Sequence, residues 1–419
     1  MTMDNIIAVI ESSSIGTSKL LLDGLLAGGY TPLFLSRNPG RFPFYGNPAI
    51  RFIETNTNDE AGMLRELNEF NRNSANKILG VTSAYDYYMP AVAFLADALD
   101  LPGQKPEAAR YARHKHNQKE AFAAQGLPLP AFQICRSATD VEHAALNIGF
   151  PVVCKPVSGA GSMGVKKFDN MPELLAHAVD WLQQATNYRG IPIEQMLLVE
   201  KFVSAPEISV EVFNGRALAL TDKYITPPPI FLETGHQVPA KLAQERYAAA
   251  MELAERAVAA LDLSFGCCHV EMHVLGDGFS LIEVNQRIAG DLIPLLVREA
   301  FGIDMIDAVI KSTIGAPVDI HAATPTSVSR IGFLLAGEVD EKSRSALETV
   351  SGIPNVVECY LAKDLPTRVE FGDPRDRVGY VVVSAPSASD CEIALRSALK
   401  ALTLKDEFFA LPHNKAKAA

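Results

Sequence analysis

Acidic and apolar side chains alternate along residues 267–285, which read Cys-Cys-His-Val-Glu-Met-His-Val-Leu-Gly-Asp-Gly-Phe-Ser-Leu-Ile-Glu-Val-Asn. The period of two on both sides of Gly276-Asp277-Gly278 predicts a β-hairpin, because successive side chains of a strand point to opposite faces. If the turn is centred on Asp277, Glu271 and Glu283 are direct cross-strand neighbours with Cβ atoms about 5 Å apart. The polar face carries His269, Glu271, His273, Glu283 and Asn285. The apolar face, which we expect to pack on a core, carries Cys268, Val270, Met272, Val274, Ile282 and Val284.

Two carboxylates this close repel each other, so either one of them keeps a proton or a cation lies between them. Oxygen ligands on a flat sheet suit Mg²⁺, which keeps several of its waters and shares the phosphates of a substrate. Asn285 adds a neutral oxygen on the same face, and Arg287 follows with a positive charge. Two alternatives stay open: a solvated outer strand, and a zinc or non-haem iron site that uses His269, Glu271, His273 and Glu283.

A glycine-rich segment, Ser158-Gly-Ala-Gly-Ser-Met-Gly164, follows an apolar run that ends at Lys155-Pro156. It matches the GxGxxG pattern, but the next residues, 165–168, favour a strand, whereas the third glycine of a dinucleotide fold opens a helix. A glycine loop between two strands can fold over a triphosphate and present backbone N–H groups, with Lys155 neutralising phosphate charge. The earlier segment 11–19 lacks the Gly-Lys pair of a Walker A loop.

The surrounding patterns predict an α/β protein in three parts. Residues 1–104 alternate apolar runs with helical periods, which predicts an amino-terminal βα, Rossmann-like domain on a parallel sheet. Residues 105–130 favour a linker helix that ends before Pro128 and Pro130. Residues 131–203 predict a small lid, and residues 204–419 a larger carboxy-terminal lobe of mixed α/β structure, with one helix over 291–313.

Composition narrows the classes of function. The chain has 419 residues, more than one core usually supports, so several packed domains are expected. Its net charge of −11 and the lack of a basic stripe argue against a nucleic-acid partner. No apolar stretch is long enough for a membrane span and the first residues do not read as a signal peptide, so we expect a cytoplasmic protein without a membrane partner. The six scattered cysteines are expected to be buried thiols.

Together these motifs resemble the ATP-grasp superfamily and, more narrowly, its carboxylate–amine ligases, the L-amino acid ligases that make dipeptides. The resemblance runs over essentially the whole chain, through 109–115, 151–156, 198–203, 233–236 and 283–287. It implies a three-part ATP-grasp fold with ATP between the lid and the lobe. It also implies that the nucleotide contacts are made by Lys115, Lys155, the loop residues Ser158, Gly159, Gly161, Ser162, Met163 and Gly164, the adenine hinge Glu200, Lys201, Phe202 and Val203, and Glu207 at the ribose.

The same resemblance implies that Glu271, Glu283 and Asn285 hold Mg²⁺, or Mn²⁺ in its place, and that Arg287 stabilises the transferred phosphate. His236 lies in a segment that faces the substrate in similar ligases and is a candidate catalytic residue. One departure concerns the residue before Lys115, often aspartate in such ligases and His114 here.

The implied function is ADP-forming ligation of a small carboxylate to an amine through an acyl phosphate, with amino acids as the expected substrates. A homodimer is one assembly we leave open. The alternatives are an ATP-grasp carboxylase that acts with a separate carrier, and a non-catalytic nucleotide-binding protein.

Overall fold

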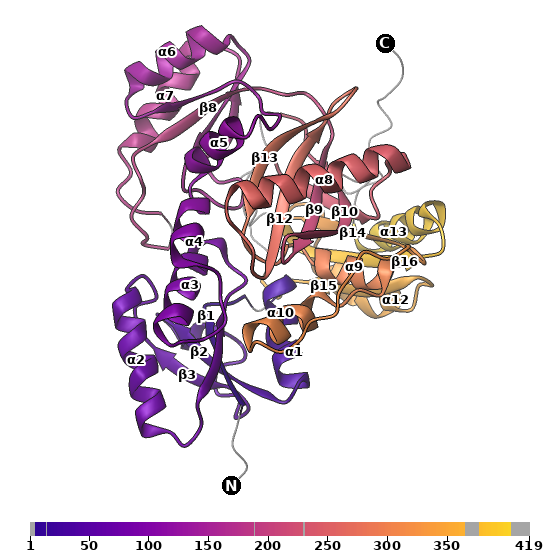
Figure 1. Cartoon of the computed structure of the whole chain (residues 1–419). Helices are drawn as coiled ribbons and strands as arrows, with labels where there is room; N and C mark the ends of the chain where they lie inside the picture. The colour runs from indigo at the N-terminus through magenta and orange to yellow at the C-terminus, as the bar shows by residue number, and fades with distance from the viewer. Residues whose placement is uncertain (1–4, 14, 188, 229–230, 365–376, 404–419) are drawn as a thin grey trace.

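The computed structural model describes residues 5–13, 15–187, 189–228, 231–364 and 377–403. Within them the chain builds three sheets: two of four strands and one of eight. In Figure 1 the first sheet lies at the bottom, the lid with α6 and α7 at the top, and the large sheet between them and to the right. The predicted mixed α/β architecture is confirmed, and no helix among the described residues is long and apolar enough to cross a membrane.

The amino-terminal domain has a parallel sheet in the order β3-β2-β1-β4. Its central strands are buried, with Ile6 to Ile10 at most 3% exposed, as their apolar runs predict. The short strand β3 is half-buried and shows no strong pattern, which is why the sequence did not indicate it. The elements are β1 (Asn5–Ile10), α1 (Gly16–Ala27), β2 (Tyr30–Ser36), β3 (Arg51–Glu54), α2 (Glu60–Asn73), β4 (Ile78–Thr82) and α3 (Met89–Ala98).

The linker region forms two helices, α4 (Pro106–Ala112) and α5 (Lys115–Ala124), in place of one. Its second helix is tied to the strand β13 (Phe279–Asn285) by the buried side chain of Gln118. The amide of Gln118 donates to the carbonyl of Val284 at 2.8 Å and accepts from its N–H at 2.9 Å. These bonds fix the start of α5, and therefore Lys115, against the predicted hairpin.

The lid has its own antiparallel sheet in the order β5-β8-β6-β7, and α6 and α7 pack together on it. Both helices begin at capping residues: the side chains of Ser137 and Asn170 accept bonds from the N–H groups of Asp140 and Glu173. The elements are β5 (Phe132–Cys135), α6 (Ala138–Ile148), β6 (Val152–Pro156), β7 (Lys166–Phe168), α7 (Met171–Leu182) and β8 (Leu197–Lys201).

The carboxy-terminal lobe centres on an antiparallel sheet in the order β13-β12-β9-β10-β11-β14-β16-β15. The expected helix over 291–313 is two helices, because Gly302 ends the first in the left-handed region with φ +71°. The second packs closely on α1, where a Cβ at Gly24 would lie 2.6 Å from Ile306. The elements are β9 (Glu207–Phe213), β10 (Arg216–Ile225), β11 (Glu233–Val238), α8 (Gln244–Ala260), β12 (Cys267–Val274), β13, α9 (Ile293–Phe301), α10 (Met305–Thr313), β14 (Val328–Leu335), α11 (Glu341–Ser345), α12 (Leu347–Ser351), β15 (Val356–Leu361), β16 (Arg377–Ala385) and α13 (Ala388–Leu402).

The cysteines behave as the sequence suggested. All six are free thiols; five are buried and Cys359 is half-buried. Burial raises the pKa of Cys268 to about 12, so this thiol is inert at neutral pH.

Candidate active site

The predicted hairpin is formed by β12 and β13, and Glu271 is paired directly with Glu283 across it. Next to the turn the register differs from the expected one by one residue, since Val274 pairs with Phe279 and not with Ser280. A bulge at Ile282 then restores the predicted pairing. It also corrects one assignment: Leu281 is the fully buried side chain that belongs to the core, whereas Ile282 is only half-buried and belongs to no core cluster among the described residues.

The two carboxylates are neutralised by two different lysines, a solution the sequence argument did not consider. Glu283 Oε2 lies 2.5 Å from Lys115 Nζ, and Glu271 Oε2 lies 2.6 Å from Lys223 Nζ. Burial alone would raise the pKa of each carboxyl group, but the lysines outweigh it and both pKa values are lowered. Both groups are therefore ionised at neutral pH. Asn285 Nδ2 donates to Glu283 Oε1 at 3.0 Å.

A second charged cluster lies on the lid side of the same cavity. Glu200 forms ion pairs with Lys155 and, at 2.6 Å, with Lys119. The pKa of Glu200 falls to about 2, because the two lysines overcome its burial, whereas burial dominates at Lys119 and lowers its pKa to about 8. The sequence analysis did not include Lys119. Its spacing of four from Lys115 on one helix face is the signal that could have found it.

The backbone of the glycine loop has a positive φ, in the left-handed region that favours glycine, at three positions. Gly161, Ser162 and Gly164 have φ values of +63°, +56° and +77°. A Cβ on Gly164 would lie 2.7 Å from the ring of Trp181, so a larger residue does not fit there. Carbonyl groups of the loop are held from the linker: Arg113 donates to Ser158 O at 2.6 Å and Lys115 Nζ to Gly159 O at 3.2 Å.

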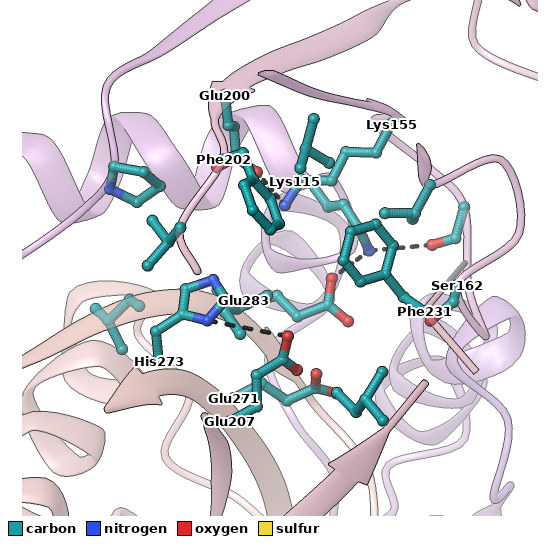
Figure 2. A pocket seen from close by; sticks show the side chains of 18 of the residues that line it. Lys115, Lys155, Ser162, Glu200, Phe202, Glu207, Phe231, Glu271, His273 and Glu283 are labelled. Carbon is teal, nitrogen blue, oxygen red and sulfur yellow. Dashed lines mark hydrogen bonds and ion pairs between the residues drawn. The ribbon is translucent and has the colours of Figure 1, made fainter. Parts of the chain in front are cut away.

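Most of the predicted nucleotide residues line one cavity between the lid and the lobe. Figure 2 shows the carboxylates of Glu207, Glu271 and Glu283 close together, with the rings of Phe202 and Phe231 at the cavity wall. The Lys201 side chain turns away and donates to the carbonyls of Gly149 and Phe150 at 3.0 and 3.1 Å. The predicted residues on the wall are Lys115, Lys155, Gly159, Gly161, Ser162, Met163, Glu200, Lys201, Phe202, Val203, Glu207, Glu271 and Glu283, whereas Ser158, Gly164 and Asn285 lie beside it.

Lys223 and Glu233 also line this cavity, and the sequence analysis had not placed either among the site residues. Lys223 Nζ lies 3.2 Å from Glu233 Oε1 and 3.9 Å from Glu207 Oε2. Glu207 responds differently from its neighbours: burial raises its pKa to about 7, although Lys223 opposes this change. The pattern of charge on β10 and β11 could not reveal this cluster, because it depends on how three strands meet.

A second cavity, of about 380 Å³, adjoins the first. Ala160, Gly161 and Met163 line both, so the glycine loop is a wall common to the two. Arg287 lies in the second cavity, where its Nε is 2.8 Å from Asp86 Oδ2. Much of the remaining surface is aromatic, contributed by Tyr85, Tyr87, Phe333, Tyr360 and Tyr380.

His236 is buried behind the second cavity and is only 1% exposed. Its Nε2 lies 3.1 Å from Asp291 Oδ2, and Arg377 Nη1 lies 2.7 Å from the same oxygen. Asp291 and Arg377 line the cavity, so His236 contacts the cavity wall through Asp291.

His269 of the hairpin is held by two carboxylates and is not placed as a zinc ligand would be. His269 Nδ1 lies 2.9 Å from Glu211 Oε1 and its Nε2 lies 3.3 Å from Glu271 Oε1. These carboxylates raise the pKa of His269 to about 10 despite its burial, so it is a cation rather than a ligand. The oxygen-rich face is therefore favoured over the zinc or iron alternative.

Comparison with known proteins agrees with this geometry. Residues 148–294 match the ATP-grasp domain family. The uncharacterized protein y4rH of Sinorhizobium fredii is 29% identical over 373 residues, 88% of this chain and 77% of that protein. Carnosine synthase 1 of Homo sapiens is 31% identical over 304 residues, 68% of this chain but 36% of its own length, so the chain spans about a third of that enzyme.

Among solved structures, the L-amino acid ligase of Bacillus licheniformis superposes with a TM-score of 0.78 at 22% identity, over 96% of this chain and 98% of that one. This similarity shows that the two chains share a fold over nearly their whole length. The family match covers the glycine loop, β8 and the carboxylate hairpin, which are the elements that surround the first cavity. Residues 148–294 of the chain therefore form an ATP-grasp domain, as the motifs predicted.

Proposed function

We propose that the protein joins the carboxylate of one amino acid to the amine of another, with ATP converted to ADP and phosphate. The observation that carries this proposal is the glycine loop shared by the two cavities. A nucleotide under one side of this loop has its terminal phosphate next to a second compartment of about 380 Å³, large enough for small carboxylate and amine substrates. The arrangement supports transfer of the γ-phosphate from a nucleotide in the first cavity to a carboxylate in the second.

The residues of the first cavity suit ATP. Backbone N–H groups of a glycine loop and the buried lysines Lys155 and Lys115 are a phosphate-binding set. Phe202 and Phe231, whose ring centroids are 6.4 Å apart, offer apolar faces for a base, and Glu207 offers an acceptor for ribose hydroxyls. We assign adenine to the segment 200–203, as the sequence predicted.

The hairpin suits Mg²⁺, or Mn²⁺ in its place. Two ionised carboxylates and a side-chain amide on one face are hard oxygen donors, with few nitrogen ligands free to compete. A bound ion would neutralise charge that develops on the phosphates during transfer. Glu283 can serve as a ligand only after Lys115 leaves it, and Glu271 only after Lys223 leaves it. Each lysine is then free to turn toward phosphate.

The proposed chemistry has two steps. An oxygen of the substrate carboxylate attacks the γ-phosphorus, the bond to the β–γ bridging oxygen breaks, and ADP leaves. Arg287 stabilises the charge on the transferred group from the second cavity, where Asp86 orients it. The amine nitrogen then attacks the acyl carbon, phosphate departs with the oxygen that came from the carboxylate, and the amine loses a proton. Tyr85, Tyr360 and Tyr380 limit the access of water to the acyl phosphate.

The related proteins support amino acids as substrates. The L-amino acid ligase, by its name, joins L-amino acids, and carnosine synthase, by its name, makes carnosine. A screen of amino acid pairs for ADP and phosphate release tests this assignment. With ¹⁸O in the substrate carboxylate, one label should appear in the released phosphate. Formation of AMP and pyrophosphate, or unlabelled phosphate from a productive pair, would contradict the mechanism.

A further inference from the structure

Three side chains with metal-binding atoms come together outside the two cavities of the proposed reaction: His114, His116 and Glu194. His114 precedes α5 in an extended conformation, and His116 is the second residue of that helix. Glu194 comes from the lid, in the segment that leads into β8. One donor atom from each can be chosen so that all three lie within 4.8 Å of one another, although 80 residues separate Glu194 from His114.

The donor atoms of this cluster lack ordinary partners among the described residues. His114 Nδ1, His116 Nδ1 and Glu194 Oε2 are inaccessible to solvent and make no hydrogen bond there. His114 Nδ1 lies 2.8 Å from Glu194 Oε2, which is close enough for an ion pair but is not oriented as a hydrogen bond. His116 Nδ1 has neither a hydrogen bond nor an ion pair among the described residues, and a buried polar atom of this kind calls for a ligand.

The geometry points to a site for Zn²⁺ or a similar transition-metal ion at His114, His116 and Glu194. Two imidazole nitrogens and one carboxylate oxygen are a zinc donor set that leaves a fourth position open. Ligand atoms on one tetrahedral zinc lie about 3.3 Å apart, so side-chain rotations of about an ångström complete the site. Mg²⁺ prefers oxygen ligands and is not expected here.

Charges of both signs lie near the cluster, and a cavity gives access to it. Glu120 adds negative charge near His116, and Arg136 adds positive charge. His114 and Glu194 line a cavity of about 500 Å³, through which an ion and its fourth ligand can enter.

A metal at this place would fasten the lid to the linker beside a residue of the nucleotide cavity. Lys115 stands between the two histidines; its N–H donates to Val157 O at 2.8 Å and its Nζ reaches Glu283. The site therefore belongs to the class of structural or regulatory metal clamps, and its existence does not depend on the proposed ligase reaction.

Zinc titration of the full-length protein, stripped of metal and held in excess Mg²⁺, tests the site. We expect one equivalent to bind, with competition against a chromophoric chelator giving the affinity. Co²⁺ in its place should show the intense visible bands of a four-coordinate site. Each of His114→Gln, His116→Gln and Glu194→Gln should weaken binding at least about tenfold. Zinc should raise the melting temperature of the unaltered protein and not that of His116→Gln.

Two control variants test whether zinc binds at this cluster and not elsewhere in the protein. His321→Gln alters an exposed histidine that lies 2.8 Å from Asp319, a similar pair that belongs to no three-residue cluster among the described residues. Glu283→Gln alters the oxygen-rich hairpin. Both controls should bind zinc as the unaltered protein does. The proposal is overturned if no stoichiometric zinc binds in excess Mg²⁺, or if binding survives in the three cluster variants, each shown to be folded by circular dichroism.

Discussion

Replacing Glu283 with glutamine tests the charge balance of the hairpin, because it keeps the size of the side chain and removes its charge. In the protein without nucleotide, Glu283 pairs with Lys115 at 2.5 Å, and the two side chains are 16% and 10% exposed. Burial and the nearby Glu271 would both raise the pKa of Glu283, but Lys115 and Lys155 outweigh them and its pKa is lowered. The fold thus favours the ionised form, so Glu283→Gln should lower stability, although cross-strand repulsion alone would predict a gain.

The size of the loss in stability follows from the hydrogen bond that glutamine can still make. Its oxygen accepts a bond from Lys115, so the change is the difference between a charge-assisted and a neutral hydrogen bond, about 1–2 kcal/mol. For a lobe of this size we expect the melting temperature to fall by about 2–8 °C. Turnover should fall about a hundredfold or more, because a ligand for the catalytic cation loses its charge.

Thermal melting without nucleotide and ADP release at saturating ATP and Mg²⁺ measure the two effects separately. The exposed Glu252 on α8 provides a matched control, since Glu252→Gln makes the same chemical change away from the site and should alter neither quantity. A rise in the melting temperature of Glu283→Gln would show that repulsion from Glu271 dominates. Undiminished turnover would refute the role of Glu283 as a metal ligand.

Three further predictions concern the loop and the pH dependence. Gly164→Ala should impair ATP binding and lid stability more than Gly161→Ala. Both positions have a positive φ, but a Cβ meets Trp181 only at Gly164. The KM for ATP and the thermal melting of the lid compare the two variants. Mg²⁺ and ATP together should protect residues 158–164 from proteolysis, and equal cleavage with and without them would count against a phosphate-covering loop. Because burial raises the pKa of Glu207 to about 7 from 4.5, the folded protein holds a proton there that the unfolded chain loses, so stability should decline between about pH 4.5 and 7, by up to about 3 kcal/mol. Glu207→Gln should remove this decline from urea midpoints measured across the window, and an unchanged pH profile would contradict it.

The hairpin shows what alternation along a sequence can and cannot predict. The period of two placed Glu271 opposite Glu283 correctly, because side-chain direction in a strand is a local property. The bulge that makes this pairing possible was not visible, since Leu281 and Ile282 are equally apolar. Only packing decides which of them enters the core. The sequence therefore predicted the pair of carboxylates but assigned Ile282 to the wrong face.

The buried lysines show more clearly what a single sequence cannot predict. Lys119 and Lys223 are 1% and 7% exposed, yet in the sequence each is an ordinary charged residue on a helix or a strand. Their role depends on glutamates from other elements, Glu200 on β8 and Glu271 on β12, and a single sequence carries no signal for such meetings. His236 is a similar case. Its motif indicated a substrate-facing residue, whereas the fold places Asp291 between it and the cavity.

The ion pairs of the first cavity have a consequence for how ligands enter it. Five lysines and five glutamates line this cavity. Four of these lysines are already paired with a glutamate, and Lys201 turns away to backbone carbonyls. A carboxylate of the hairpin accepts a cation only when its lysine departs, and a buried lysine departs only when another anion receives it, because an unpaired buried charge costs several kcal/mol. We expect phosphate to be that anion. The nucleotide and its metal ion are therefore expected to bind as one unit, and the same pairs that keep the cavity stable without ligand disfavour the entry of either one alone.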